Sequence, residues 1–384
     1  MQGRQRICTR GNGACGGIGL PEACDPCVKR IRHKTRSRFF SGVSSDTLAD
    51  MAKVRISSED PNAQKPRILV IRRDNIGDLV CTLPLFESLR RHYPKARLGA
   101  LVNSYNAPLL QGNPVIDHIH VYTKGKHQPQ TARLSLARDR LGLLLELRGL
   151  RYQAVVHAGS RMRPEMRLIA RLAGIKHEIL DQSGDQSLHE VERVHGLLHA
   201  FGIGGPPPAP CLTPPTTARA AVRSSLAEQG FEGAIGLHIS AREDENRWPL
   251  ASFAALIKAG ADHGHKFVIF WSPGDSKRPE HPGDDDRART LMTLCRGLPA
   301  IAYPTADLAR LTAALAAVPV LVGSDGGHCH IAAAVGTRVI GLYCSHKTRQ
   351  WRPWGTAHTV LSAPQVKDIS VEAVLAALPK DART

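Results

Sequence analysis

The sequence predicts an α/β protein made of two doubly wound, Rossmann-like domains that face each other across a cleft. Two observations predict this fold class. Short apolar runs of strand length alternate with segments of helical periodicity through residues 66–365, which is the pattern of parallel sheets covered by helices. A stretch rich in proline and glycine at residues 204–216 divides that pattern into halves of similar size, as expected of a stiff linker.

The first predicted domain comprises residues 66–203. It begins with Arg67-Ile-Leu-Val-Ile-Arg72, whose consecutive apolar residues suit a strand buried on both faces. A turn containing Gly77 follows, and helical spacing of apolar residues begins at Asp78. The same alternation then continues. We predict strands at 67–72, 97–102, 117–122, 153–157 and 177–180, and helices at 78–91, 105–111, 133–150, 164–173 and 189–201.

The second predicted domain comprises residues 217–365 and repeats the alternation. Residues 366–384 add a last helix near 370–378 and a tail. We predict strands at 234–239, 266–271, 319–323 and 338–343, and helices at 217–229, 250–263, 285–296, 306–316 and 328–335. Ligand sites favour domain interfaces, so we expect the functional residues to lie between the two domains.

Residues 1–60 differ from the rest of the chain because they are rich in Gly, Arg, Ser and Cys and lack periodicity. We expect either a disordered extension or a start site assigned too early, with Met51 just ahead of the globular pattern. Four cysteines lie here, and only the last two have the CxxC spacing, so a zinc site has weak support: Cys8, Cys15, Cys24 and Cys27.

The composition restricts the partners. The formal net charge of +17 suits an anionic partner, which could be a phosphorylated substrate, a membrane surface or a nucleic acid. No apolar run approaches the roughly 18 residues of a membrane-spanning helix, and no apolar segment resembles a signal peptide. The remaining cysteines are scattered singly, which is typical of reduced cytoplasmic thiols.

The strongest local signal is the strand, turn and helix predicted within residues 318–337. Gly323, Gly326 and Gly327 let the chain turn sharply, and the helix N-terminus that follows favours an anion. Asp325 stands at the strand end, where an open α/β sheet places ligand-binding groups, and His330 flanks the same loop. The pattern predicts a nucleotide-diphosphate site. A glycine-rich loop with a capping Asp is the alternative.

A second candidate site is the turn Arg72-Arg-Asp-Asn-Ile-Gly-Asp78 after the first strand. Asp78 could serve as a general base facing the cleft. Alternatively, its role could be limited to capping the helix that begins there. Asp74 is a weaker candidate for the base. Arg73 and Asp74 are also weak candidates for contacts to the acceptor or its phosphates.

A third candidate follows the strand at 234–239. Ser240, Arg242 and Arg247 could contact phosphates, because the arginine fork matches phosphate oxygens. Trp248 is expected to pack in the core. These residues lie at the carboxyl end of a parallel strand, which is the edge where such sheets bind ligands.

Two residue clusters could be considered as metal sites, but we expect neither of them to bind a metal. Asp284, Asp285 and Asp286 precede a predicted helix, where first-turn acids are common, although one of them could hold a ribose. The fragment 189–199 has His195 and His199 on one helix face but no evident third ligand. We therefore predict no metal site and no cofactor.

The ordered motifs resemble glycosyltransferase family 9, the family of the lipopolysaccharide heptosyltransferases. The resemblance covers about residues 66–365 and rests on four stretches: Arg72-Arg-Asp-Asn-Ile-Gly-Asp-Leu-Val-Cys-Thr-Leu-Pro84, Arg247-Trp-Pro249, Ser324-Asp-Gly-Gly-His-Cys-His-Ile-Ala-Ala-Ala334 and Trp351-Arg-Pro353. It implies a GT-B fold, with the acceptor bound by the N-terminal domain and an ADP-sugar by the C-terminal one. It also implies inverting transfer without a metal.

The resemblance assigns roles to individual residues. Asp78 matches the proposed general base, and Arg247 stands where the family has a basic residue near the donor phosphates. Gly326 replaces a threonine that often follows Asp325 in the family, and either Asp284 or Asp285 could be the ribose-binding acid. The residues that match the nucleotide loop are Asp325, Gly326, Gly327 and His330.

These expectations define one predicted function and two alternatives. We expect a cytoplasmic enzyme, free or peripheral on the inner membrane, that moves a sugar such as heptose from an ADP-sugar to an anionic cell-envelope glycolipid. A nucleotide-sugar epimerase could use the same two-domain fold. A nucleic-acid-binding protein could use the basic charge, although we expect no specific nucleic-acid partner.

Overall fold

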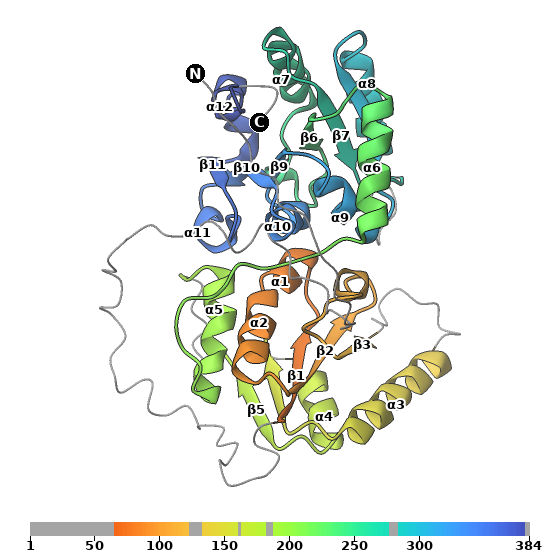
Figure 1. Cartoon of the computed structure of the whole chain (residues 1–384), viewed down its shortest axis with the longest axis vertical. Coiled ribbons are helices and arrows are strands. Elements are labelled where there is room, and N and C mark those ends of the chain that lie inside the picture. Colours follow the sequence, from red (N-terminus) through yellow and green to blue (C-terminus); the bar gives the residue numbers. More distant parts are fainter. Residues whose placement is uncertain (1–64, 123–132, 160–162, 182–186, 276–282, 381–384) are drawn as a thin grey trace, which may run out of the picture. The chain divides into compact units, whose positions relative to one another are not determined.

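The computed structural model contains two parallel sheets and describes residues 65–122, 133–159, 163–181, 187–275 and 283–380 (Figure 1). The predicted α/β class with two parallel sheets is therefore confirmed. The expected N-terminal extension and its four cysteines lie outside the described residues, as do residues 381–384. The domain boundaries given above stay predictions.

The N-terminal sheet has five strands in the order β3-β2-β1-β4-β5. All neighbouring strands pair in parallel, with Ile68 of β1 opposite Leu98 on one side and Ala154 on the other. The central strand β1 is almost wholly buried because helices cover both faces of the sheet. The strands are β1 (Arg67–Arg72), β2 (Arg97–Asn103), β3 (His118–Tyr122), β4 (Ala154–His157) and β5 (His177–Leu180).

Each face of this sheet has its own helices (Figure 1). Ile68 and Val70 of β1 share a core with α2 and α5, whereas Leu69 and Ile71 point the other way, toward α3 and α4. The alternation of side chains along a strand explains this division. The helices are α1 (Ile76–Val80), α2 (Leu83–His92), α3 (Arg133–Leu150), α4 (Pro164–Leu172) and α5 (Glu190–Gly196), with 3-10 turns η1 (Ala107–Leu110) and η4 (Leu197–Phe201).

Three predicted helices differ from the structure. The helix expected at 189–201 is α5 followed by the 3-10 turn η4. The helix expected at 78–91 is two helices, because the chain bends at Cys81 and Thr82, ahead of Pro84, which has no N–H to continue the ladder. The helix expected at 105–111 is only the short turn η1. The helix break separates Asp78, in α1, from the longer amphipathic helix α2.

The C-terminal sheet has six parallel strands in the order β11-β10-β9-β6-β7-β8. Its helices also lie on both faces, with α7, α8 and α12 against one core and α6, α9 and α10 against the other. The strands are β6 (Ile235–His238), β7 (Phe267–Trp271), β8 (Ala300–Pro304), β9 (Val320–Ser324), β10 (Arg338–Cys344) and β11 (His358–Ala363).

The helices of this half begin after the proline-rich stretch. Trp248 is buried next to Phe253 at the start of α7, so the expected core role for Trp248 is confirmed. The helices are α6 (Thr216–Glu228), α7 (Leu250–Asp262), α8 (Asp285–Leu294), α9 (Leu308–Leu315), α10 (Gly327–Ala334), α11 (Thr348–Trp351) and α12 (Val371–Ala377), with 3-10 turns η5 (Asp244–Asn246) and η6 (Val366–Asp368).

Sequence reasoning missed the two edge strands of this sheet, β8 and β11. Both are only partly buried, so neither has the continuous apolar run that marks a central strand. Pro304 ends β8, and an edge strand tolerates proline because one side of its backbone needs no partner.

Both sheets reverse their strand order once, and these reversals position the sites. In the N-terminal sheet the reversal lies between β1 and β4, and in the C-terminal sheet it lies between β6 and β9. Loops at the carboxyl ends of such strand pairs diverge and leave a crevice that ligands use. All three candidate loops, after β1, β6 and β9, therefore begin at reversal points.

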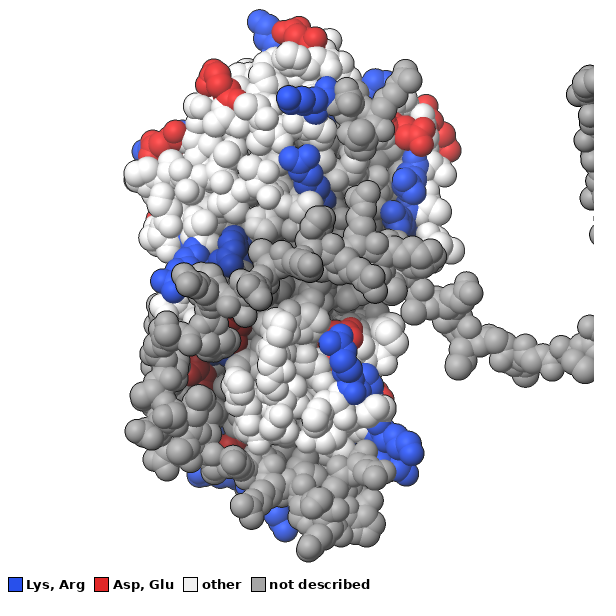
Figure 2. Space-filling model, turned by 60° about the vertical axis from the view of Figure 1, so that its left-hand side comes forward, with Lys and Arg blue, Asp and Glu red and all other residues white. Residues whose placement is uncertain are grey.

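The charge surplus is dispersed on the face displayed in Figure 2. Lys and Arg side chains of the described residues form separate groups there among uncharged residues, rather than one continuous stripe (Figure 2). None of the helices in the described part of the chain has the length and apolar character that a bilayer crossing requires.

Candidate active site

The reversal point of the N-terminal sheet contains a buried charge cluster around Arg72, the last residue of β1. The side chain of Arg72 is only 1% exposed, and its guanidinium donates to Asp78 and to the carbonyl of Ala158. It also lies 2.7 Å from Glu190 Oε1 and 3.3 Å from Asp74 Oδ2. Burial lowers the pKa of Arg72, but Asp78 and Glu190 outweigh that effect and leave the pKa raised.

Asp78 is the third residue of α1, and its side chain is 13% exposed. One carboxylate oxygen accepts from the backbone N–H of Asn75 at 3.1 Å, which completes a capping box, and the other binds Arg72. The capping role considered above is thus present, and the ion pair is added to it. A carboxylate has about four acceptor sites, so both oxygens can still accept a proton or another hydrogen bond.

Glu190 and Arg193 belong to the same cluster, and sequence reasoning missed both. Glu190 Oε1 accepts from Arg193 at 2.7 Å, and Arg193 also reaches Asp181 at 2.8 Å. Burial raises the pKa of Glu190, but the hydrogen bonds from Arg193 and the charge of Arg72 outweigh it and lower the pKa. A Glu and an Arg three residues apart in a predicted helix were the available signal.

The histidines of the same segment have structural partners. His189 begins α5: its Nδ1 accepts from the N–H of Val191 at 3.1 Å, and its Nε2 lies 2.8 Å from the Arg352 carbonyl. Burial lowers the pKa of His189 to about 4. His195 Nε2 lies 2.8 Å from the hydroxyl of Ser88. These contacts give His189 and His195 structural partners.

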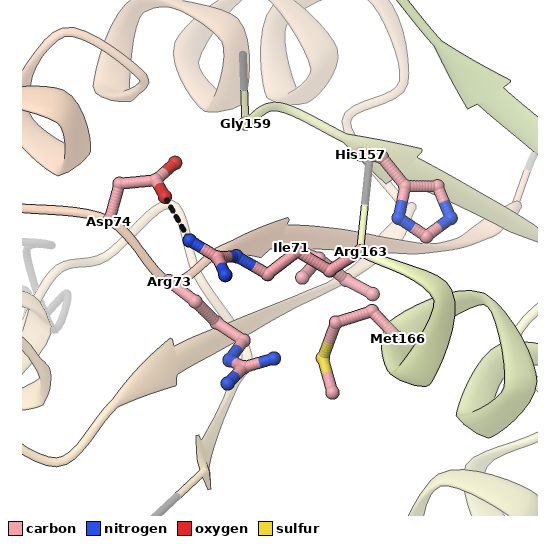
Figure 3. A pocket seen from close by; sticks show the side chains of 7 residues that line it. All are labelled: Ile71, Arg73, Asp74, His157, Gly159, Arg163 and Met166. Atoms are coloured by element: carbon pink, nitrogen blue, oxygen red, sulfur yellow. Dashed lines mark ion pairs between the residues drawn. The ribbon is translucent and has the colours of Figure 1, made fainter. Parts of the chain in front are cut away.

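A small pocket opens at the same reversal point (Figure 3). Arg73 is buried with its guanidinium 3.6 Å from the centre of the Tyr122 ring, and Arg163 faces Asp74 at 3.9 Å. The Nε of Arg73 and the Nε2 of His157 have no hydrogen-bond partner. Burial lowers the pKa of Arg73, yet a guanidinium remains cationic at neutral pH.

The C-terminal reversal point contains the loop between β9 and α10. Gly323 lies inside β9 rather than in the turn, which is a correction to the expected strand end. Gly326 has extended backbone, and a Cβ added there would lie 2.9 Å from Cε1 of His328, so the site leaves little room for a side chain. Burial raises the pKa of Asp325 to about 6, with Lys347 acting in the opposite direction.

Two stacked histidines lie beneath this loop. The rings of His238, at the end of β6, and His328, in α10, have centroids 3.8 Å apart and planes 13° apart. Burial lowers the pKa of His238 to about 4 and that of His328 further. The Nδ1 of His238 and the Nε2 of His328 have no hydrogen-bond partner. The loop therefore rests on a pair of neutral, buried rings.

Helices α1 and α10 are in contact, so the first and last candidate loops meet. A Cβ added to Gly77 would lie 2.7 Å from Cδ2 of His330, and one added to Gly327 would lie 2.8 Å from Ile76. The Nδ1 of His330 lies 3.6 Å from the Cys81 sulfur, and burial lowers the pKa of His330 to about 4. His330 thus packs against α1.

The loop after β6 joins the same region. Arg242 donates to the side-chain oxygen of Asn75 at 2.9 Å, and the Ser240 hydroxyl accepts from the N–H of Ser272 at 3.1 Å. Arg247 donates to Asp284 at 2.9 Å, and its Nε lies 3.3 Å from Asp244. The structure brings Arg242 to the turn that contains Asp78 and gives Arg247 a carboxylate partner.

The three consecutive acids do not converge. Asp284 binds Arg247, Asp285 accepts from the indole N–H of Trp271 at 2.7 Å, and Asp286 lies 2.8 Å from Arg289. Asp285 and Asp286 occupy the first turn of α8, so the expected helix-start role is confirmed. In the described ranges, no group of three or more His, Cys, Asp or Glu side chains is placed to hold a metal ion.

Comparison with known proteins identifies the family. The profile of Glycosyltransferase family 9 (heptosyltransferase) matches residues 150–376, which is more than half of the chain. The chain belongs to glycosyltransferase family 9. The resemblance stated from the motifs is confirmed, and the protein is a glycosyltransferase family 9 enzyme. Asp78 lies upstream of the matched residues, so its role depends on the geometry and on the motif.

Similar proteins agree with this assignment. Escherichia coli lipopolysaccharide heptosyltransferase 3 is 24% identical over 298 residues, which cover 72% of this chain and 83% of that protein. The structure of the E. coli ADP-heptose lipopolysaccharide heptosyltransferase II has a TM-score of 0.65 at 20% identity, covering 81% of this chain and 96% of that one. The structure of the E. coli heptosyltransferase WaaC with ADP-2-deoxy-2-fluoro heptose has a TM-score of 0.58 at 19% identity. The match covers 80% of this chain and 97% of that one. The fold class GT-B is confirmed.

Proposed function

We propose that this enzyme transfers a heptosyl residue from ADP-heptose to the lipopolysaccharide core or a related cell-envelope glycolipid, with inversion and without a metal ion. The observation that carries the proposal is the contact between α1, which holds Asp78, and α10, which begins at the glycine loop. This contact supports the proposal because the helix with the candidate base packs against the helix that follows the candidate donor loop. The names of the similar proteins supply the sugar and the acceptor class.

In the proposed reaction Asp78 accepts the proton of an acceptor hydroxyl while that oxygen attacks the anomeric carbon of the donor. The bond between the anomeric carbon and the diphosphate oxygen breaks, and ADP leaves with the electron pair. Attack from the face opposite ADP inverts the anomeric centre. Arg72 has a positioning role, because its ion pair fixes the orientation of the Asp78 carboxylate.

The donor side would stabilise the leaving diphosphate. Gly327 begins α10, and the first N–H groups and the dipole of this helix favour a phosphate there. Arg247 supplies positive charge once a phosphate competes with Asp284 for its guanidinium. Ser240 lies in the same loop system, and Asp284 or Asp285 remains the proposed ribose contact.

The acceptor side would use the pocket of Figure 3. Arg73 and Arg163 come from opposite sides of the reversal point, and both present guanidinium groups there. The two guanidinium groups, and the Nε of Arg73 that has no hydrogen-bond partner, support binding of an anionic group in this pocket. A phosphate or carboxylate of the acceptor core fits this chemistry.

The decisive experiment incubates the enzyme with ADP-heptose and a lipopolysaccharide acceptor that lacks heptose. We expect mass spectrometry to show one added heptose, and NMR to show an anomeric configuration opposite to that of the donor. Chelator should leave the rate unchanged. Loss of activity with chelator and recovery with magnesium would overturn the metal-free mechanism, and donor epimerised without acceptor would favour the epimerase.

A further inference from the structure

Four leucines on α3 and α4 are unusually exposed for their type. Leu141 and Leu145 of α3 are 56% and 59% exposed, and Leu168 and Leu172 of α4 are 57% and 49% exposed. Each pair is four residues apart, so its members lie on one helix face. Exposed apolar side chains gathered on neighbouring elements mark interaction sites.

The leucines face away from the protein core. In α3 the core-facing positions are Leu143 and Leu147, which are buried against the N-terminal sheet. Leu141 and Leu145 fall on the opposite side of the helix at 100° per residue. Arg148 of α3 donates to the backbone carbonyl of Leu172 at 3.5 Å, so the two helices are adjacent at this point. We call the four leucines and their flanking arginines the leucine face.

Positive charge surrounds the leucine face. Arg138 and Arg148 lie three residues before and after the α3 pair, so they share its side of the helix. The described side chains between Leu136 and Leu172 include seven arginines and three acids, a surplus of four: Arg138, Arg140, Arg148, Arg151, Arg163, Arg167 and Arg171 against Asp139, Glu146 and Glu165.

Two of the three acids are engaged elsewhere. Glu146 lies 2.9 Å from the Nδ1 of His120, which is buried in the sheet, and Glu165 lies 3.5 Å from Arg73 at the pocket. Glu178 of β5 lies 2.8 Å from Arg167 and 3.4 Å from Arg171, which reduces the surplus to three. The outer surface of α3 and α4 therefore combines apolar side chains with a modest net positive charge. Two copies of the chain would repel each other if they met through this surface.

We propose that the leucine face docks on the surface of a bilayer that contains anionic phospholipids. The leucines would enter the boundary between headgroups and acyl chains, while the arginines bind lipid phosphates. Arg163 and Met166 line the pocket of Figure 3 and belong to the start of α4. Docking through α4 would hold that pocket beside the headgroups, where a glycolipid presents its sugars.

Vesicle binding tests this proposal without any substrate, so its failure is separate from failure of the proposed transfer. The full chain is sedimented with vesicles of phosphatidylglycerol and phosphatidylethanolamine, or of phosphatidylcholine alone. We expect binding to the anionic vesicles, weaker binding to the neutral ones, and loss of binding as salt screens the charges. Every variant keeps residues 1–64, so any contribution from that segment is common to all.

The variants separate the two components of the face. Changing the leucines to serine (L141S/L145S/L168S/L172S) should lower the partition coefficient about tenfold or more, because they supply the inserted apolar area. R138Q/R148Q should lower it several-fold on anionic vesicles only. The matched controls L294S and R219Q/R223Q, at exposed positions on α8 and α6, should bind as the unchanged protein does.

Three outcomes would overturn the proposal. The first is unchanged vesicle binding by the serine variant, and the second is an equal loss of vesicle binding in the α8 and α6 controls. The third is an association between copies of the chain that the serine changes abolish while vesicle binding persists. Light scattering without vesicles measures the last. If the fourfold variant does not fold, the double variants L141S/L145S and L168S/L172S are each measured in the same vesicle assay. Circular dichroism and ADP affinity serve as folding controls.

Discussion

The two sheets reverse their strand order at equivalent places, yet the loops there are built from opposite chemistry. Beside β1 and β4 the cluster is charged: Arg72 is buried among Asp74, Asp78 and Glu190. Beside β6 and β9 the supports are neutral: His238 and His328 stack beneath a loop of glycines. The topology thus places candidate loops at both reversal points, and a few residues decide what each can bind.

The difference matches the two halves of the proposed reaction. A general base must be ionised and held in one orientation, and buried ion pairs achieve both. A diphosphate brings its own negative charge, so its site needs exposed N–H groups and close backbone approach rather than a carboxylate cluster. Removal of a charge is therefore expected to impair the cluster beside β1 and β4. Addition of a charge is expected to impair the loop beside β6 and β9.

The largest effect is expected from Asp78→Asn, on turnover. The amide cannot accept the acceptor proton, so turnover should fall by roughly 10²–10⁴-fold, or about 2.7–5.4 kcal/mol of barrier. Stability should fall by about 1.5–3 kcal/mol, because Arg72 loses an anionic partner. Melting, ADP-heptose affinity and turnover are measured on one preparation.

Asp74→Asn is the matched control for that experiment. Asp74 also contacts Arg72 but is more exposed, and it stands outside α1. We expect this variant to lose much less turnover than Asp78→Asn, because Asp74 lines the proposed acceptor pocket and is not the proposed base. Near-normal turnover of Asp78→Asn together with a loss in Asp74→Asn would transfer the role of general base to Asp74.

Glu190→Gln should have the next largest effect, on stability. Glu190 is buried between Arg72 and Arg193, and removal of one partner from a buried ion pair costs about 3–5 kcal/mol. Urea unfolding should show this loss, and turnover should fall as well because Arg72 no longer orients Asp78. Glu192→Gln, at an exposed position of the same helix, should cost less than about 1 kcal/mol.

Arg247→Ala tests the donor side. Loss of a hydrogen bond to a charged group should weaken ADP binding by about 1.5–3 kcal/mol in calorimetry. Arg289→Ala is the control, since Arg289 pairs with Asp286 at the exposed end of the same acidic run. Equal ADP affinity in Arg247→Ala and the unchanged enzyme would remove Arg247 from the nucleotide site.

The smallest expected effect concerns acid stability and His238. Its folded pKa of about 4 lies below the ordinary value of 6.5, so the unfolded chain binds the proton first and stability falls as the pH drops. Between pH 7 and pH 5 this amounts to about 2 kcal/mol. His238→Gln should remove that share of the pH dependence of the unfolding free energy.

Two comparisons sharpen that measurement. His263→Gln, at an exposed position, is the matched control for the substitution of a histidine by glutamine. Asp325 acts in the opposite direction: its raised pKa means that its contribution to stability increases as the pH falls and is lost as the pH rises through about 6. An unchanged slope in His238→Gln would contradict the view that the loop rests on neutral rings.

The sequence by itself determined the central strands, the fold class and the three loops that bear the sites. Runs such as Ile68–Ile71 and Val320–Val322 are apolar because both faces of a parallel strand are buried. Such a local run of apolar residues can be recognised in the sequence alone. Edge strands such as β8 lack it, because one side of them meets solvent. The candidate catalytic motif was visible for a similar local reason, as a glycine and an acid at a helix start.

Only the tertiary structure decided which distant residues complete each loop. Glu190 reaches Arg72 across 118 residues of sequence, and Arg242 reaches Asn75 across 167. His330 packs on Gly77 because α1 and α10, which follow strands of different sheets, approach closely. The periodicity of neither segment predicts that contact. Pairing of β1 with β4, and of β6 with β9, places the loops of each sheet at a reversal point. The contacts of Arg242 and His330 with the turn after β1 join loops of the two sheets, so strand order within one sheet does not explain them.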